Sequence, residues 1–298
     1  MKNLTIRASL GRAEFIEVEK NVRLHVSDLG EGSPVVLLHG WPFSDAMYEY
    51  QYSALVRNGY RVVGITFRGF GQSDKPFGKY SYDVFAEDVK FILEELGIQN
   101  GVLGGFSFGA ATAIRFTSKY PNEHIIKLAL FGPAAPCEVR RNDFPFGLPI
   151  EILNNLIQLN AENRPQLLEE FGKLFGASES ALPKNIYEWL AGIQIQSSQY
   201  AMEQGLYMIR DSDLRADLEK IKIPTAIFHG KQDKLCPFEL AEQLHKGIRN
   251  SKLVPFENSG HALFLEERVK FNDELIKFVK DKSFEKDFKP GIAKELVA

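Results

Sequence analysis

The stretch GVLGGFSFGAATAIRF, residues 101–116, decides the fold. Gly101 to Phe106 is a small, apolar run typical of a buried strand, and Phe108 to Lys119 has the spacing of a helix. Ser107 stands at the junction, with one glycine two residues before it and another two residues after it. Glycines leave room for a sharp backbone bend. The pattern therefore predicts a strained turn from strand to helix that lifts the Ser107 hydroxyl clear of a sheet.

Strand-like and helical patterns alternate on both sides of this junction, which favours a mostly parallel sheet covered by helices on both faces. The expected strands are Phe15 to Val18, Val22 to Val26, Val35 to Leu38, Arg61 to Thr66, Gly101 to Phe106, Ile125 to Phe131, Thr225 to Phe228 and Lys252 to Phe256. The expected helices are Ala46 to Val56, Tyr82 to Leu96, Phe108 to Lys119, one opening at Pro237, and Leu263 to Val279. The first two strands are expected to pair as a hairpin.

The alternation stops after Pro133, and amphipathic stretches without strands follow. They lie at Ile150 to Leu159, Arg164 to Leu174 and Ile186 to Ile195. We therefore predict a helical insertion and divide the chain into four parts. These are residues 1–136, the first part of the core; 137–220, a helical cap; 221–280, the second part of the core; and 281–298, a peripheral tail.

Composition limits the classes of partner. The net charge of -3 and the sequence pI of about 6.1 provide no basic surface for nucleic acid or anionic lipid, so a small-molecule substrate is expected. The N-terminus lacks the pattern of a secretory signal, and no apolar run is long enough to span a membrane. We expect a cytoplasmic protein without a membrane partner, and the oligomeric state stays open.

The sequence gives no indication of a metal or cofactor. Cys137 and Cys236 are far apart and in no metal-binding spacing, so we expect free thiols. The segment GVLGGFSFG does not match the spacing of a dinucleotide-binding loop, and no cluster of metal ligands occurs. The predicted chemistry therefore rests on side chains and backbone amides alone.

A serine hydroxyl is a weak nucleophile and needs a base and a carboxylate that orients the base. In this architecture the three follow one another as serine, then aspartate or glutamate, then histidine. His261, in a loop of small residues after the last strand, is the base that this order selects among the histidines. The carboxylate is Asp233, just after strand Thr225 to Phe228, at the sheet edge where such folds build their sites. We predict a triad of Ser107, Asp233 and His261.

The remaining histidines and three other aspartates were weighed and set aside. The histidines are His25, His39, His124, His229 and His245, and the aspartates are Asp211, Asp213 and Asp217. His39 is expected to be structural. The other histidines lie before the late strands, at a strand end or within a helical pattern, and the aspartates belong to the insertion and its exit.

Two backbone amides are expected to stabilise an oxyanion beside Ser107. The amide of Phe108 opens a helix, where N–H groups point outward without partners. The amide of Trp41 lies in the loop after strand Val35 to Leu38, the usual source of the second donor. Pro42 restricts Trp41 towards an extended backbone and so orients its amide and carbonyl.

From about Val22 to Val279 the chain resembles the α/β-hydrolase superfamily. The resemblance rests on His39-Gly40-Trp41-Pro42, Phe67-Arg68-Gly69-Phe70-Gly71-Gln72-Ser73, Gly105-Phe106-Ser107-Phe108-Gly109, His229-Gly230-Lys231-Gln232-Asp233 and Asn258-Ser259-Gly260-His261. It is closest to the branch of cofactor-free haloperoxidases, perhydrolases and arylesterases. The resemblance implies a mostly parallel, eight-stranded sheet flanked by helices, with a helical cap. It also implies hydrolase chemistry at the predicted triad.

One position departs from the family pattern, because Thr66 stands where an aspartate commonly braces loops near the site. The sequence therefore does not predict the geometry of that loop. The prediction of the triad is not affected. The apolar cap residues are expected mainly to pack the cap onto the core. They include Phe144, Phe146, Leu148, Leu206, Tyr207 and Met208.

The leading prediction is a serine hydrolase that cleaves small to medium carboxylic esters through an acyl-enzyme, with perhydrolysis as a side activity. Two alternatives use the same fold. One is hydrolysis of a carbon–carbon bond in a diketone-type substrate, and the other is a ligand receptor without catalysis. Dehalogenase and epoxide hydrolase activities are disfavoured, since both need an aspartate in place of Ser107.

Overall fold

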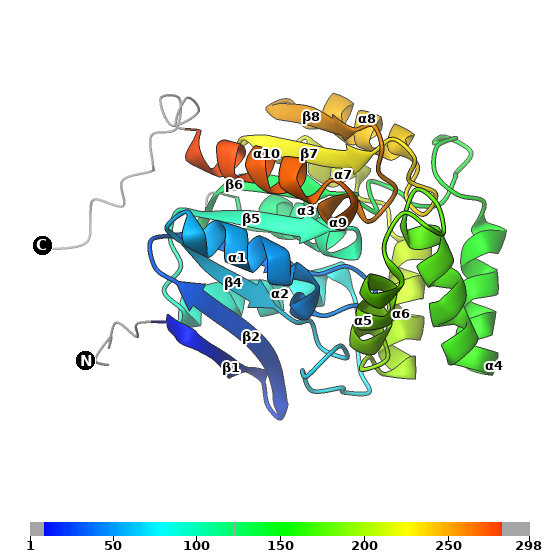
Figure 1. Ribbon diagram of the computed structural model, residues 1–298, viewed down its shortest axis with the longest axis horizontal. Coiled ribbons are helices and arrows are strands. Elements are labelled where there is room, and N and C mark those ends of the chain that lie inside the picture. The colour runs from blue at the N-terminus through cyan, green and yellow to red at the C-terminus, as the bar shows by residue number, and fades with distance from the viewer. Residues whose placement is uncertain (1–8, 122, 282–298) are drawn as a thin grey trace, which may run out of the picture.

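The computed structural model describes residues 9–121 and 123–281, which form a twisted sheet with helices on both faces (Figure 1). The strands are β1 (Ser9–Glu19), β2 (Val22–Gly30), β3 (Ser33–Leu38), β4 (Tyr60–Ile65), β5 (Gly101–Phe106), β6 (Ile125–Phe131), β7 (Thr225–Gly230) and β8 (Ser251–Phe256). Their spatial order is β1-β2-β4-β3-β5-β6-β7-β8. The β1–β2 and β2–β4 pairs are antiparallel and all later pairs are parallel. The predicted fold class is confirmed.

Helices cover both faces of the sheet (Figure 1). Helices α1 (Glu49–Arg57) and α10 (Arg268–Lys280) contact each other on one face. Helices α2 (Tyr82–Glu95), α3 (Phe108–Lys119), α7 (Arg215–Leu218) and α8 (Phe238–Gly247) form a continuous row on the other face. Because both faces are covered, the central strands are buried throughout, which explains why they appear as uninterrupted apolar runs in the sequence.

Three helices of the insertion gather beyond one end of the sheet (Figure 1), whereas its last helix, α7, belongs to the row on the sheet. They are α4 (Ile150–Phe175), α5 (Lys184–Gln194) and α6 (Gln199–Asp211). Helix α4 contains a non-helical residue, Asn163, whose side chain accepts the backbone N–H of Gln166, and Pro165 follows the break. The kink explains why the sequence shows two separate amphipathic stretches there.

Two helix predictions are wrong in detail. The helix expected from Ala46 begins as a short 3₁₀ turn, η1 (Asp45–Tyr48), before α1. The long helix expected at residues 263–279 is split into α9 (Leu263–Glu266) and α10, because Glu267 has non-helical dihedral angles of φ -108° and ψ 47°. The carboxylate of Glu267 accepts hydrogen bonds from the loop before α9, and this pairing accompanies the break.

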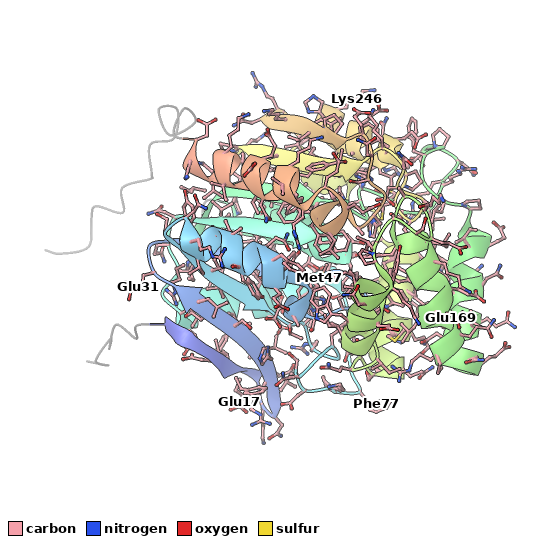
Figure 2. The ribbon with its side chains drawn as sticks, viewed as in Figure 1. Glu17, Glu31, Met47, Phe77, Glu169 and Lys246 are labelled. Atoms are coloured by element: carbon pink, nitrogen blue, oxygen red, sulfur yellow. The ribbon has the colours of Figure 1, made fainter. Side chains whose placement is uncertain are left out.

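The interior is apolar and the surface is charged. Met47 is fully buried, whereas Glu17, Glu169 and Lys246 lie on the outside (Figure 2). Within the described residues, no helix combines the length and the apolar character needed to cross a membrane. Of the tail expected at 281–298, residues 282–298 lie outside the described part of the chain.

Candidate active site

Ser107 occupies a strained turn between β5 and α3, as its glycine neighbours predict. Its φ of 52° and ψ of -113° lie in a region that non-glycine residues rarely adopt. A side chain at Gly105 would overlap the carbonyl oxygen of Gly109, and one at Gly109 would overlap the carbonyl oxygens of Leu38 and His39. The two glycines are therefore required by close backbone packing, which lets β5 turn directly into the helix.

Asp233 lies in the loop after β7, and its side chain is buried within a set of donors. One carboxylate oxygen, Oδ1, accepts the backbone N–H groups of Leu235 at 2.9 Å and Cys236 at 2.8 Å. The other, Oδ2, lies 2.7 Å from Nδ1 of His261 and 3.3 Å from Nε2 of His229. The loop thus fixes one oxygen by backbone bonds and directs the other at two imidazoles.

The environment of Asp233 keeps its carboxyl ionised. Burial by itself raises the pKa of Asp233, because a buried charge loses its hydration. The charge of His261 and the hydrogen bonds from His229 and His261 outweigh burial, so the pKa of Asp233 lies well below its ordinary value. The carboxylate is therefore suited to orient an imidazole and to stabilise its cation.

His261 lies in a loop that two glutamates hold in place. The carboxylate of Glu266 accepts the N–H of Gly260 at 2.8 Å and the N–H of Ala177, from the cap, also at 2.8 Å. Glu267 accepts the hydroxyl of Ser259 at 2.7 Å. The pair therefore ties the loop before His261 to α9 and to the cap. Sequence reasoning missed both residues, because they fall inside the helix that was expected to be continuous.

Ser107 and His261 lie at the same end of the sheet without a hydrogen bond between them. The imidazole packs on Phe106, the residue before Ser107, with ring centroids 4.6 Å apart. Among the described residues, the Ser107 hydroxyl has the thiol of Cys236, at 4.0 Å, as its side-chain neighbour within bonding range. In enzymes without substrate, a catalytic hydrogen bond is often long or poorly aligned. The structure thus joins Asp233 to His261 and places Ser107 nearby.

The two predicted oxyanion donors have unoccupied amides. Phe108 is the first residue of α3, so its N–H has no acceptor within the helix. In the described residues neither this amide nor that of Trp41 donates to another backbone carbonyl. The indole of Trp41 donates to the carbonyl of Met202, in α6, at 3.0 Å, which ties this loop to the cap.

Comparison with known proteins agrees with this fold. A family model described as alpha/beta hydrolase fold matches residues 33–268. The chain belongs to the α/β hydrolases. It is similar to the AB hydrolase superfamily protein YisY of Bacillus subtilis, with 39% identity over 89% of this chain and 98% of that protein.

Two solved structures match this α/β hydrolase closely. One is an esterase from Exiguobacterium antarcticum, with 38% identity, a TM-score of 0.88, and coverage of 91% of this chain and 100% of that chain. The other is a bromoperoxidase from Bacillus anthracis, with 33% identity, the same TM-score of 0.88, and coverage of 91% and 100%. These likenesses place the chain near the haloperoxidase branch of the family, as its motifs predict.

Two histidines set aside as bases have structural contacts in this hydrolase. His39 donates from Nδ1 to the carbonyl of Gly40 at 2.9 Å and accepts the N–H of Phe67 on Nε2 at 3.0 Å. Burial lowers the pKa of His39 to about 4, so it stays neutral and able to accept. His229 donates to the carbonyl of Cys236 at 2.7 Å besides approaching Asp233. The sequence pattern contained no signal for this second partner of Asp233.

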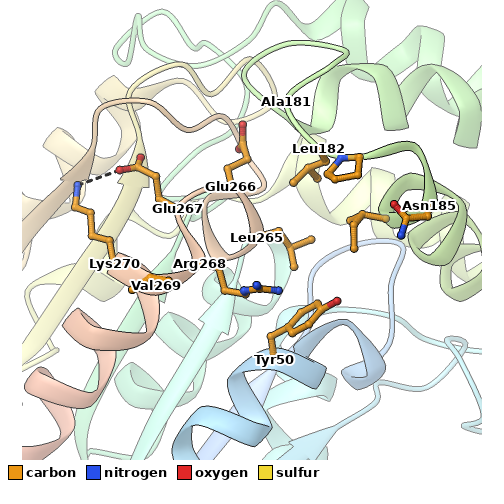
Figure 3. Close-up of a pocket in the computed structure, with 12 residues that line it drawn as sticks. Tyr50, Ala181, Leu182, Asn185, Leu265, Glu266, Glu267, Arg268, Val269 and Lys270 are labelled. Carbon is orange, nitrogen blue, oxygen red and sulfur yellow. Dashed lines mark ion pairs between the residues drawn. The ribbon is translucent and has the colours of Figure 1, made fainter.

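A separate cavity of about 620 Å³ lies between the cap and the start of α10 (Figure 3). Tyr50, Leu182 and Arg268 line it, and the Arg268 guanidinium stands 4.3 Å from the centroid of the Tyr50 ring. Ser107 and His261 do not line this cavity, and their side chains are buried. The cavity is therefore distinct from the space around the candidate nucleophile.

Proposed function

We propose that this α/β hydrolase cleaves small to medium carboxylic esters through an acyl-enzyme formed on Ser107. One observation carries the proposal. The hydrogen bond of 2.7 Å by which Asp233 orients His261 lies at the same end of the sheet as the strained turn at Ser107. The similar esterase structure supports the reaction class. The three side chains are buried, and burial favours a small neutral substrate over a charged one.

The roles follow from the donors and acceptors of each residue. His261 takes the proton of Ser107 as the hydroxyl oxygen attacks the ester carbonyl, and Asp233 stabilises the imidazolium that forms. The amides of Trp41 and Phe108 donate to the oxyanion. His261 then protonates the leaving alcohol. Water, deprotonated by the same imidazole, hydrolyses the acyl-enzyme and releases the acid and free Ser107.

Perhydrolysis is the expected side activity. Hydrogen peroxide in place of water attacks the same acyl-enzyme, and the products are a peracid and free Ser107. The similarity to a bromoperoxidase supports this step, because a peracid oxidises bromide. A bromide oxidation that requires both peroxide and a carboxylic acid or ester is the expected result. Oxidation at background while ester cleavage proceeds would remove this part of the proposal.

The test is a series of p-nitrophenyl esters from acetate to decanoate, with Ser107→Ala and, as the matched control, Ser27→Ala. Ser107→Ala is expected to lower kcat/KM by about 10³-fold or more, since the nucleophile is lost. Ser27 is hydrogen-bonded to Asp45 away from the site, and its variant is expected to keep activity within about 3-fold. Equal turnover by Ser107→Ala would contradict the assignment.

Two further outcomes separate the alternatives. A fluorophosphonate probe is expected to label the wild-type protein and not Ser107→Ala. Absence of label on the wild-type protein would favour a ligand receptor. Label without turnover of any ester, together with cleavage of a vinylogous diketone, would favour a carbon–carbon bond hydrolase.

A further inference from the structure

Glu138 is an acid buried beside the thiol of Cys236. It follows β6, and its carbonyl accepts the N–H of Leu148 at 2.8 Å, which fixes the backbone. Its side chain is buried, with 3% of the residue exposed, and among the described groups neither carboxyl oxygen has a hydrogen-bond partner. Buried polar groups in folded proteins are almost always paired, since an unpaired one costs about 1–3 kcal/mol. The mechanism proposed above does not use this carboxyl.

The neighbours of Glu138 place it beside the nucleophile. The thiol of Cys236 interacts with the Glu138 carboxyl and lies 4.0 Å from the Ser107 hydroxyl oxygen. Tyr82, at the start of α2, also has a buried hydroxyl without a partner among the described residues. Glu138 and Cys236 both act electrostatically on the Tyr82 hydroxyl. Glu138 and Tyr82, whose polar groups have no hydrogen-bond partners among the described residues, therefore both interact with Cys236. The Tyr82 ring packs on Phe108, the residue after Ser107, with ring centroids 5.3 Å apart.

Burial favours the neutral form of both groups. Burial raises the pKa of Glu138 well above its ordinary value, and the charge of Asp233 raises it further. Burial likewise raises the pKa of the Tyr82 hydroxyl. A neutral carboxylic acid offers one O–H donor and one carbonyl acceptor, and a phenol donates and accepts through one oxygen. Such a pair is complementary to an alcohol, which also donates and accepts.

We propose that Glu138 and Tyr82 form a subsite that binds a hydroxyl group carried by the acyl chain close to the scissile carbonyl. The preferred substrates are then esters of short hydroxy acids, and the inference rests on the ester hydrolysis proposed above. A carboxylate on the acyl chain fits less well, because the ionised Asp233 lies close by and the site supplies no cation among the residues named. A plain alkyl chain leaves both polar groups unpaired, which is the arrangement that lets a site reject an analogue.

The experiment compares ethyl 3-hydroxybutanoate with ethyl butanoate, two esters that differ in one hydroxyl group. Their hydrolysis is followed by pH-stat. The measured quantity is the ratio of their kcat/KM values. For the wild-type protein the ratio is expected to favour the hydroxy ester by about 10-fold or more, since a hydrogen bond inside a dry site discriminates strongly. Glu138→Leu, of similar volume and without polar atoms, is expected to lower that ratio by about 10-fold.

Two other variants keep the test sharp. Glu138→Gln retains a donor and an acceptor, so its ratio is expected to stay within about 3-fold of the wild type. Tyr82→Phe removes one of the two groups and is expected to lower the ratio by about 3-fold or more, and it decides the case if Glu138→Leu does not fold. A ratio that is equal in the wild-type protein, Glu138→Leu and Tyr82→Phe overturns the subsite.

The same measurements test the subsite separately from the proposed ester hydrolysis. Turnover of both esters that depends on Ser107, with a ratio indifferent to residues 82 and 138, overturns the subsite alone. Failure of the wild-type protein to cleave either ester overturns the proposed function and the subsite together.

Discussion

Two buried aspartates in this hydrolase each contact a histidine, and one of these pairs lies at the end of the sheet that carries Ser107. Asp233 lies 2.7 Å from Nδ1 of His261, at the end of the sheet near Ser107. Asp45, in the turn after β3, lies 3.2 Å from Nδ1 of His25. In both cases burial alone raises the pKa of the aspartate, and the histidine and other donors reverse the shift to a net lowering. An aspartate–histidine pair with a lowered carboxyl pKa is therefore no mark of catalysis by itself.

The difference lies in what the rest of each network contacts. The remaining acceptor capacity of Asp45 is filled by hydroxyl groups, at 2.6 Å from Ser27, at 2.9 Å from Tyr52 and from Thr66. These bonds join β2, the loop after β4 and α1 into a closed network. Asp233 instead accepts from two backbone amides with one oxygen and directs the other oxygen at imidazoles, one of which packs on Phe106, the residue before Ser107. Asp45 therefore joins three elements of the fold, whereas the role proposed for Asp233 is to orient a base.

The largest expected effect comes from exchanging each carboxylate for an amide. Asp233→Asn keeps the volume but removes the charge that favours the correct tautomer of His261, so kcat for p-nitrophenyl acetate is expected to fall by about 10³- to 10⁴-fold. Asp45→Asn is expected to leave kcat of the folded protein within about 3-fold. Steady-state kinetics on both variants measure the contrast.

Unfolding in urea supplies the other half of that comparison. Asp45→Asn is expected to lower the free energy of unfolding by about 2–4 kcal/mol, because the charge is lost and the new NH2 group cannot accept the two hydrogen bonds of the oxygen that it replaces. Comparable loss of kcat in both variants, with folded Asp45→Asn, would show that the Asp45 network serves the chemistry as well.

The acid dependence of stability gives a second, intermediate effect. The folded-state pKa of Asp45 lies below its ordinary value of 3.8, so the unfolded chain binds more protons in acid. The stabilisation is present above about pH 4 and is lost as the pH falls through the folded-state pKa. The stability gap between the wild-type protein and Asp45→Asn is expected to be flat from about pH 5 to 8 and to narrow below about pH 4. A stability gap between the two proteins that widens in acid would contradict the lowered pKa of Asp45.

Much of this site could be predicted from local sequence. The apolar runs correspond to strands because both sheet faces are covered, and Gly105 and Gly109 reveal the turn at Ser107 because no other side chain fits there. Asp233 and His261 follow from chain order and from their positions after strands. These signals are local, since each depends on backbone conformation or on the nearest element.

The rest depends on contacts between residues distant in the sequence. Glu138 stands in a polar stretch before two arginines, where an acid is ordinarily solvated, and burial appears only when α2 and the loop after β7 pack around it. His229 contacts Asp233 because the loop after β7 folds back towards the end of that strand. Glu266 and Glu267 accept hydrogen bonds from the loop before His261 because the helix is broken between α9 and α10. No periodicity in the chain encodes these pairings.

Thr66, the residue that departs from the family pattern, supplies the smallest expected effect and the finest test of the comparison. Its hydroxyl donates to Asp45 and accepts the Asp45 backbone N–H at 3.1 Å, so the carboxylate of this network comes from residue 45 and Thr66 serves it. Thr66→Val keeps the shape but removes both bonds, and is expected to cost about 1–3 kcal/mol, with a lower Tm and kcat within about 2-fold. Thr66→Ser keeps the hydroxyl and is the matched control, expected to restore most of the stability. A Thr66→Val protein with unchanged Tm but reduced kcat would show that Thr66 supports catalysis. The distinction between a structural Asp45 and a base-orienting Asp233 would then be contradicted.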